Sequence, residues 1–190
     1  MNVKVILLLI CLVGYVAIGL GQSNKAIRPD LSGTWEFDAA RSNVAKSKKS
    51  APEQIKITHH DPELTIHRKV SIDGVQEERD LTYYTDGRGE TNPTTAWVTT
   101  NPGSESWRPN QTKSKTSWSK NKVVTRSVSQ TFGGGAVFEF EIVDEWRLSS
   151  DGKTLTKTSK TIPSRNLTGN AAFVIGNGAE FKEVYKLISK

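Results

Sequence analysis

Apolar and polar side chains alternate with a period of two along most of this chain, and turn-forming residues divide the alternating segments from one another. Such alternation is typical of β-strands with one buried face, and no segment beyond residue 21 keeps apolar residues at helical spacing for three turns. Asp-Pro, Asp-Gly, Asn-Gly and Gly-Gly-Gly sequences favour hairpins at the divisions. We predict strands at 33–38, 54–60, 63–72, 75–85, 94–99, 112–119, 122–132, 136–149, 153–162 and 180–188.

Successive hairpins build an antiparallel meander, in which each strand pairs with the strands before and after it in the sequence. An open sheet of this kind would leave two exposed edges, and closure into a barrel removes them. The sequence therefore predicts an all-β fold, an antiparallel up-and-down β-barrel of about eight to ten strands, formed by one domain over residues 31–190. Its predicted core comprises Trp35, Ile57, Ile66, Leu81, Val128, Phe138, Phe140, Ile142 and Leu148.

The N-terminus has the layout of a cleavable signal peptide. An apolar run follows Lys4 and ends in the small-x-small triplet Gly19-Leu20-Gly21. The run is shorter than the roughly 20 residues of a membrane-spanning helix, and Cys11 within it lacks the sequence context of a lipoprotein cysteine. We expect a signal peptide over 1–21, a flexible leader over 22–30, and a secreted or periplasmic mature chain without stable membrane insertion.

The chain is basic, with a net charge of +6 at pH 7. Its lysines are dispersed among Asp and Glu along the predicted strands, and no nucleic-acid-binding motif accompanies them. In an exported protein, the excess positive charge favours anionic surfaces or anionic small molecules. We therefore expect no nucleic-acid partner.

The hairpin around Asp73-Gly74 indicates which side chains its two strands turn inward. A two-residue turn there places Ile66 opposite Leu81, and the same register places Leu64 opposite Tyr83. The apolar faces of both strands then coincide, which is what a buried face requires.

This register also turns two arginines inward, because Arg68 falls opposite Arg79 on the apolar face. A guanidinium stays charged and is costly to bury without a partner. Glu77 is the one carboxylate nearby on that face. One of the two arginines therefore needs water or an anionic ligand as its partner.

A second hairpin follows the glycine run at 133–135. A five-residue loop from Gly133 to Val137 would place Val124 opposite Trp146. Arg126 would then oppose Asp144 on the inner face, where the two could form a structural ion pair or contribute to a ligand site.

Three sequence segments carry a resemblance to a known family. The first predicted strand contains Gly33-Thr34-Trp35, and later segments contain Tyr84-Thr85-Asp86-Gly87 and the turn from Leu148 to Leu155. A Gly-x-Trp at the start of a β-meander resembles the first-strand signature of the calycins, the lipocalins and fatty-acid-binding proteins. The later segments are similar to those of secreted lipocalin-like proteins of environmental bacteria.

The resemblance implies that Trp35 plugs the closed end of the barrel beneath a basic residue. It also implies a ligand in the interior, although the Arg-x-Tyr carboxylate clamp of fatty-acid-binding proteins is replaced here by Glu183-Val184-Tyr185. An insertion over 163–178 would cap one mouth. The available basic residues for the Trp35 position are Lys182, Lys186 and Arg147.

Other chemistries lack the residues they need. The register turns His59 inward but His60 and His67 outward, which argues against a shared metal ion. The glycine run at 133–135 has no following Lys-Ser/Thr, and no serine lies in a nucleophile-elbow sequence. We expect no metal, no cofactor and no enzymatic activity.

The most favoured function is therefore an exported lipocalin-like protein that binds a small amphipathic or anionic molecule. Aromatic rings would supply apolar wall, although tryptophans in a barrel also serve as ordinary packing. The alternative is a filled barrel without a cavity, acting as an envelope structural or protein-interaction module. The candidate ligand-binding residues are Arg68, Arg79, Arg126, Tyr83 and Trp146.

Overall fold

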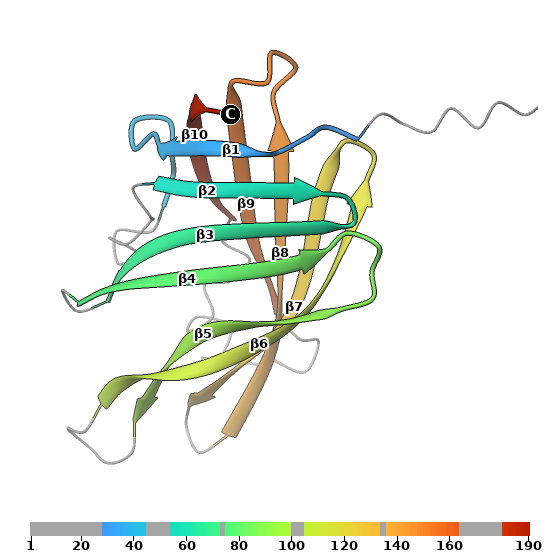
Figure 1. Cartoon of the computed structure of the whole chain (residues 1–190). Helices are drawn as coiled ribbons and strands as arrows, with labels where there is room; N and C mark the ends of the chain where they lie inside the picture. Colours follow the sequence, from blue (N-terminus) through green and yellow to red (C-terminus); the bar gives the residue numbers. More distant parts are fainter. Residues whose placement is uncertain (1–27, 45–53, 73–74, 100–104, 134–135, 164–179) are drawn as a thin grey trace, which may run out of the picture.

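The protein forms ten antiparallel β-strands in a computed structural model that describes residues 28–44, 54–72, 75–99, 105–133, 136–163 and 180–190 (Figure 1). The predicted signal peptide, most of the leader and most of the 163–178 insertion lie outside these residues. No helix within the described ranges has the length and apolar character needed to cross a membrane. The strands are β1 (Gly33–Phe37), β2 (Gln54–His60), β3 (Glu63–Ile72), β4 (Val75–Tyr84), β5 (Glu90–Thr99), β6 (Glu105–Ser119), β7 (Lys122–Gly133), β8 (Ala136–Leu148), β9 (Thr154–Pro163) and β10 (Glu180–Ser189).

The strands form one sheet that curls into a nearly closed barrel. Their order is β4-β3-β2-β1-β10-β9-β8-β7-β6-β5, so each strand pairs with its sequence neighbour and β1 pairs with β10. The predicted all-β, up-and-down antiparallel architecture is confirmed. Two strands begin earlier than predicted, β5 at Glu90 and β6 at Glu105. Each contains a proline, Pro93 or Pro109, a residue that sheets tolerate chiefly near their edges.

An apolar core fills the barrel toward the end that holds the 61–62, 85–89, 120–121 and 149–153 turns. Trp35 lies at its centre with none of its surface exposed, and its indole Nε1 donates a hydrogen bond to the carbonyl of Leu31 at 3.1 Å. Gly33 permits the close approach of β10, because a Cβ at this position would lie 2.7 Å from Leu187. The buried core cluster comprises Leu31, Trp35, Ile55, Ile57, Leu64, Ile66, Leu81, Val123, Trp146, Leu155 and Tyr185.

Most of the described core predictions are confirmed. Trp35, Ile57, Ile66 and Leu81 are buried, and Leu148 packs against them. Phe140 and Ile142 are partly buried, and the side chain of Phe138 lies outside what the structure describes. Val128 is the exception, because it is 60% exposed on the outer face.

The exposure of Val128 follows from a wrong prediction of the register between β7 and β8. Gly133 pairs with Ala136, so a two-residue turn replaces the predicted five-residue loop. The shift moves Arg126 from Asp144 to a position opposite Val143. Because successive side chains alternate between faces, a one-residue slip exchanges inside and outside. Arg126 therefore lies on the outer face, where its guanidinium pairs with Glu141 at 2.9 Å.

The hairpin of β3 and β4 has the predicted register throughout. Ile66 pairs with Leu81, Leu64 with Tyr83, and Arg68 with Arg79. An Asp-Gly sequence fits a two-residue turn well, which leaves one register that brings the two apolar faces together.

Side chains close the seam between β4 and β5, the two strands at the ends of the sheet order. The amide of Asn92 accepts a hydrogen bond from the backbone N–H of Thr82 at 2.7 Å and donates one to its carbonyl at 2.8 Å. Asn92 is 7% exposed, so these bonds are shielded from water. A single side chain thus replaces the reciprocal backbone pair that would otherwise join the two strands.

Glu90 extends this seam toward the turn. Its carboxylate accepts a hydrogen bond from the backbone N–H of Tyr84 at 3.3 Å, and the hydroxyls of Ser114 and Thr116 on β6 donate to it at 2.6 and 2.7 Å. A buried carboxylate requires such donors to offset its lost hydration. The β4–β5 junction is therefore tied to β6 as well.

Replacing Asn92 tests the seam. We expect Asn92→Ala to destabilise the protein by about 2–4 kcal/mol, because two buried backbone groups of Thr82 lose their partners. Urea denaturation measures the change, and the exposed Asn110→Ala on β6 is the control. Equal stability of Asn92→Ala and Asn110→Ala would contradict this role.

Candidate functional site

A layer of charged side chains lies inside the barrel next to the apolar core. Lys157 of β9 projects between Asp144 of β8 and Glu183 of β10, the strands that flank it. Arg68 of β3 and Arg79 of β4 occupy the inward positions one step beyond Ile66 and Leu81. Alternation along each strand turns all of these side chains to the same side as the core.

Lys157 lies between two carboxylates of this layer. Its ammonium lies 3.5 Å from Asp144 and 3.9 Å from Glu183, and it sits 5.6 Å from the ring centroid of Trp146. Burial alone would lower the pKa of Lys157, but the two carboxylates outweigh this effect and raise the pKa above its ordinary value. The lysine therefore stays charged. Both ion pairs are longer than a direct hydrogen bond.

The two carboxylates each have a hydroxyl donor. Tyr185 donates to Glu183 at 2.8 Å, and Ser159 donates to Asp144. Burial, assisted by the adjacent Glu183, raises the pKa of Tyr185. The ring of Tyr185 also stacks on Trp146, with 6.4 Å between centroids. Trp146 is thus anchored in the core.

The two inward arginines differ in their partners. Arg79 donates to Glu77 through Nε at 3.2 Å and through Nη2, and its side chain is only 10% exposed. Arg68 has a buried Nε without a hydrogen-bond partner, and it joins no ion pair among the residues that the structure describes. Its charge nevertheless reaches Tyr83, where burial raises the pKa of the phenol and Lys157 and Arg68 partly oppose the rise.

The predicted site residues thus separate into three groups. Arg68, Arg79 and Tyr83 face the interior as predicted, and Trp146 is buried there but packs as part of the core. Arg126 is exposed on the outer face, so the argument for including it no longer holds.

Lys157 and Glu183 were not predicted from the sequence to be interior groups. Lys157 lies in the run 156–160, which contains only polar residues and offers no apolar face of its own to fix its direction. The β8–β9 hairpin pairs Leu148 with Leu155 and Trp146 with Lys157, so carrying the predicted inward direction of Trp146 across this hairpin would have oriented Lys157 inward.

Three titratable side chains of this layer have raised pKa values. A general acid or base works best with a pKa near the working pH. The pKa values of Lys157, Tyr83 and Tyr185 are all raised, away from neutrality. No group of three or more metal-binding side chains gathers in the described part of the chain.

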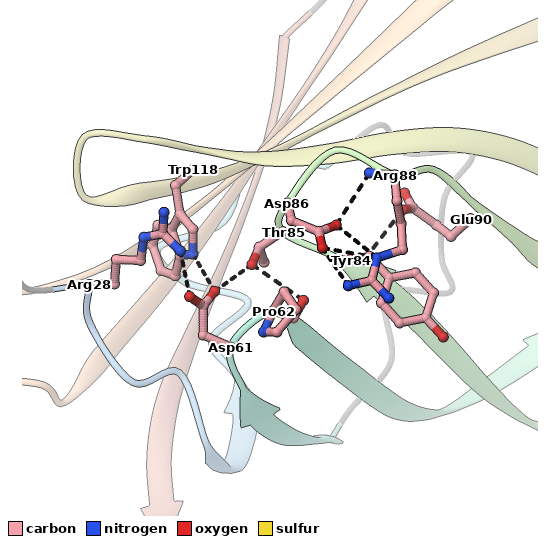
Figure 2. A network of polar contacts seen from close by, with 9 residues as sticks. All are labelled: Arg28, Asp61, Pro62, Tyr84, Thr85, Asp86, Arg88, Glu90 and Trp118. Carbon is pink, nitrogen blue, oxygen red and sulfur yellow. Dashed lines mark hydrogen bonds and ion pairs between the residues drawn. The ribbon is translucent and has the colours of Figure 1, made fainter.

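The opposite end of the core is shut by a network centred on Asp61 (Figure 2). Its carboxylate accepts hydrogen bonds from Trp118 of β6 at 2.9 Å, from the hydroxyl of Thr85 and from Arg28 of the leader. Burial would raise the pKa of Asp61, but these three donors outweigh it and lower the pKa to about 2. One carboxylate therefore joins three distant segments of the chain.

This network differs from the arrangement that the calycin resemblance implies. Lys186 pairs with Asp38 at 3.1 Å instead of covering Trp35, while Arg147 and Lys182 are exposed. At this end Arg28 lies 5.7 Å from the ring centroid of Trp118. The expected basic residue over Trp35 is thus replaced by an arginine over a different tryptophan.

His59 lies inside the same end, as predicted. Its Nδ1 accepts a hydrogen bond from the backbone N–H of Leu31 at 3.3 Å. Burial is the main cause of its lowered pKa. Neutral His59 is therefore a structural group beside Trp118, with 5.7 Å between the two rings.

Comparison of this chain with models of protein families, with curated proteins and with solved structures finds no match.

The Asp61 network predicts acid sensitivity. The folded pKa of about 2 lies below the ordinary 3.8, so its stabilisation is complete above about pH 4 and is lost as the pH falls toward 2. We expect this loss to be about 1–2 kcal/mol after allowance for the carboxyl's partial exposure. Asp61→Asn should lose stability at pH 7 and show a flatter decline between pH 4 and 2 in urea denaturation. A decline as steep as that of the wild type would contradict this assignment.

Proposed function

We propose that this chain is an exported, calycin-like binding protein whose barrel holds a small amphipathic anion, with Arg68 as the principal contact for its carboxylate or phosphate headgroup. The observation that carries the proposal is the buried Nε of Arg68, which has no hydrogen-bond partner among the described residues. A buried N–H donor without an acceptor is costly, and a bound oxyanion would supply one.

The surroundings of Arg68 favour an anion over a neutral ligand. Arg79 stands directly across the β3–β4 ladder, and Arg68 is close enough to Lys157 for its charge to oppose the rise in the pKa of Lys157. Arg79 is already bonded to Glu77, and Lys157 is balanced by two carboxylates. Among the described residues of this layer, three cations are matched in number by three carboxylates, and Arg68 is the cation without a direct ion pair.

The position of Arg68 also orients the ligand. Ile66, the next inward residue on β3, is buried in the core that fills the Asp61 end. A headgroup at Arg68 would thus have its apolar part directed toward the other end of the barrel. Tyr83 lies beside the headgroup, where its raised pKa keeps the phenol protonated as a hydrogen-bond donor.

A filled structural barrel is the second candidate, and the internal ion pairs favour it. Arg79–Glu77 and Lys157 with its two carboxylates satisfy most of the interior charge without any ligand. In that case, water would be the partner of Arg68 and no small molecule would bind.

Titration with a fluorescent fatty-acid analogue separates the two candidates. We expect saturable binding by the wild type and a loss of about 10- to 100-fold in affinity for Arg68→Gln, equivalent to about 1.5–3 kcal/mol for a hydrogen bond to a charged group. Arg79→Gln should lose less, because Arg79 already has a partner.

Arg126→Gln is the matched control, since it removes an arginine from the outer face of the same barrel. Circular dichroism establishes that each variant is folded. Absence of binding to the wild type would favour the filled barrel, and equal affinity of the wild type and Arg68→Gln would refute the headgroup assignment.

Export is tested separately by intact mass. We expect protein isolated from the secreted or periplasmic fraction of its host to begin near Gln22, because the apolar run and its small-residue triplet match a cleavable signal. A full-length, membrane-bound product would contradict this expectation.

A further inference from the structure

An open hollow lies on the outer surface at the Asp61 end, separate from the barrel interior. It has a volume of about 600 Å³, within the usual range for small-molecule sites. Four segments meet there: the leader, the β6–β7 turn, the end of β8 with its following turn, and the start of β9. The lining residues are Pro29, Asn121, Arg147, Leu148, Ser149, Ser150, Gly152 and Thr156.

The charge of this hollow is unbalanced. Arg147 is exposed, and it takes part in no ion pair among the described residues. None of the lining residues is acidic. Carboxylates next to the lining residues have partners of their own: Glu145 pairs with Lys122 at 2.5 Å, Asp151 accepts bonds from Ser149 and the Lys153 N–H, and Asp30 accepts a bond from the Ser32 N–H at 2.9 Å.

Neutral donors accompany the guanidinium. Thr156 is the direct cross-strand neighbour of Arg147 on the outer face. Ser150 and Asn121 add a hydroxyl and a side-chain amide to the same lining. An arginine fork together with hydroxyl and amide donors suits a tetrahedral oxyanion, which accepts several hydrogen bonds at once.

We propose that this hollow binds a phosphate group, with Arg147 as its charged contact and Thr156 as a hydroxyl donor. This site is independent of the interior site proposed above, since it lies on the opposite face of the sheet. Free phosphate and the phosphodiester of a lipid headgroup share this chemistry. The lipid headgroup differs from free phosphate because it carries organic substituents, which must also fit the hollow beside Pro29.

The leader forms one wall of the site, so the Asp61 network also positions it. Arg28, held by Asp61 and stacked on Trp118, immediately precedes Pro29. Losing the Asp61 carboxylate should release this wall without removing any donor. Asp61 is thus a positioning residue for the hollow.

Nuclear magnetic resonance titration at constant ionic strength tests the proposal. We expect inorganic phosphate to shift the amide signals of Ser150 and Gly152 saturably at millimolar concentration, and glycerophosphoglycerol, a soluble lipid headgroup, to do the same if a phosphodiester is accepted. Stronger binding of inorganic phosphate identifies free phosphate as the source, and stronger binding of the headgroup identifies a lipid.

The variants define the contacts. Arg147→Gln should weaken phosphate binding at least about tenfold, and Thr156→Val should weaken it severalfold. The matched control Arg126→Gln, an exposed arginine on the same outer face of the β7–β8 hairpin, should leave the affinity unchanged. Non-saturable shifts with both ligands, an unchanged affinity in Arg147→Gln, or an equal loss in Arg126→Gln would overturn the proposal.

Discussion

The pair of hydrogen bonds between the Asn92 amide and the Thr82 backbone is the interaction on which the barrel depends. Every other junction in the sheet is a backbone ladder, whereas β4 and β5 are the terminal strands of the sheet order. Without the amide, the two edges would expose unpaired backbone groups, and water would enter beside the interior charges. Water entry would weaken every electrostatic interaction inside, because a higher local dielectric reduces each one.

A closed seam lets the interior combine an apolar half with a charged half. The apolar half is filled by Trp35 and its neighbours and is shut by Asp61, which receives donors from β6, the 85–89 turn and the leader (Figure 2). In the charged half, Lys157 is held by carboxylates from the strands on either side of it. Since those three strands are consecutive in the sheet, the pairing register itself assembles this cluster.

The residues of each turn determined how well the strand register could be predicted from the sequence. Asp73-Gly74 allows a tight turn with one plausible register, so the inward positions of Arg68, Arg79 and Tyr83 could be predicted. Three consecutive glycines at 133–135 accept many backbone conformations and leave the register open. The apolar residues of β7 and β8 fit two registers almost equally well, and the wrong choice placed Arg126 and Val128 inside.

The sequence contains weaker indications of the β4–β5 seam and of the Lys157 cluster. A side chain that substitutes for a backbone pair, as Asn92 does, has no periodic pattern, and the preceding Glu90 resembles an ordinary solvated carboxylate. Lys157 faces inward because it pairs with Trp146 on β8 and with Glu183 on β10. The pairing with β10 spans a long insertion, and the polar run 156–160 has no alternation that specifies it.

The attachment of Arg28 to Asp61 fixes the end of the barrel at which the chain enters β1. The chain reaches β1 beside the short, well-packed turns, at the end that the core seals. An affinity tag, a fusion partner or a solid support joined directly at residue 28 would therefore be attached at the sealed end. Immobilisation through the N-terminus then presents the opposite end of the barrel to the solution and leaves the 600 Å³ hollow, which lies at the sealed end, facing the support.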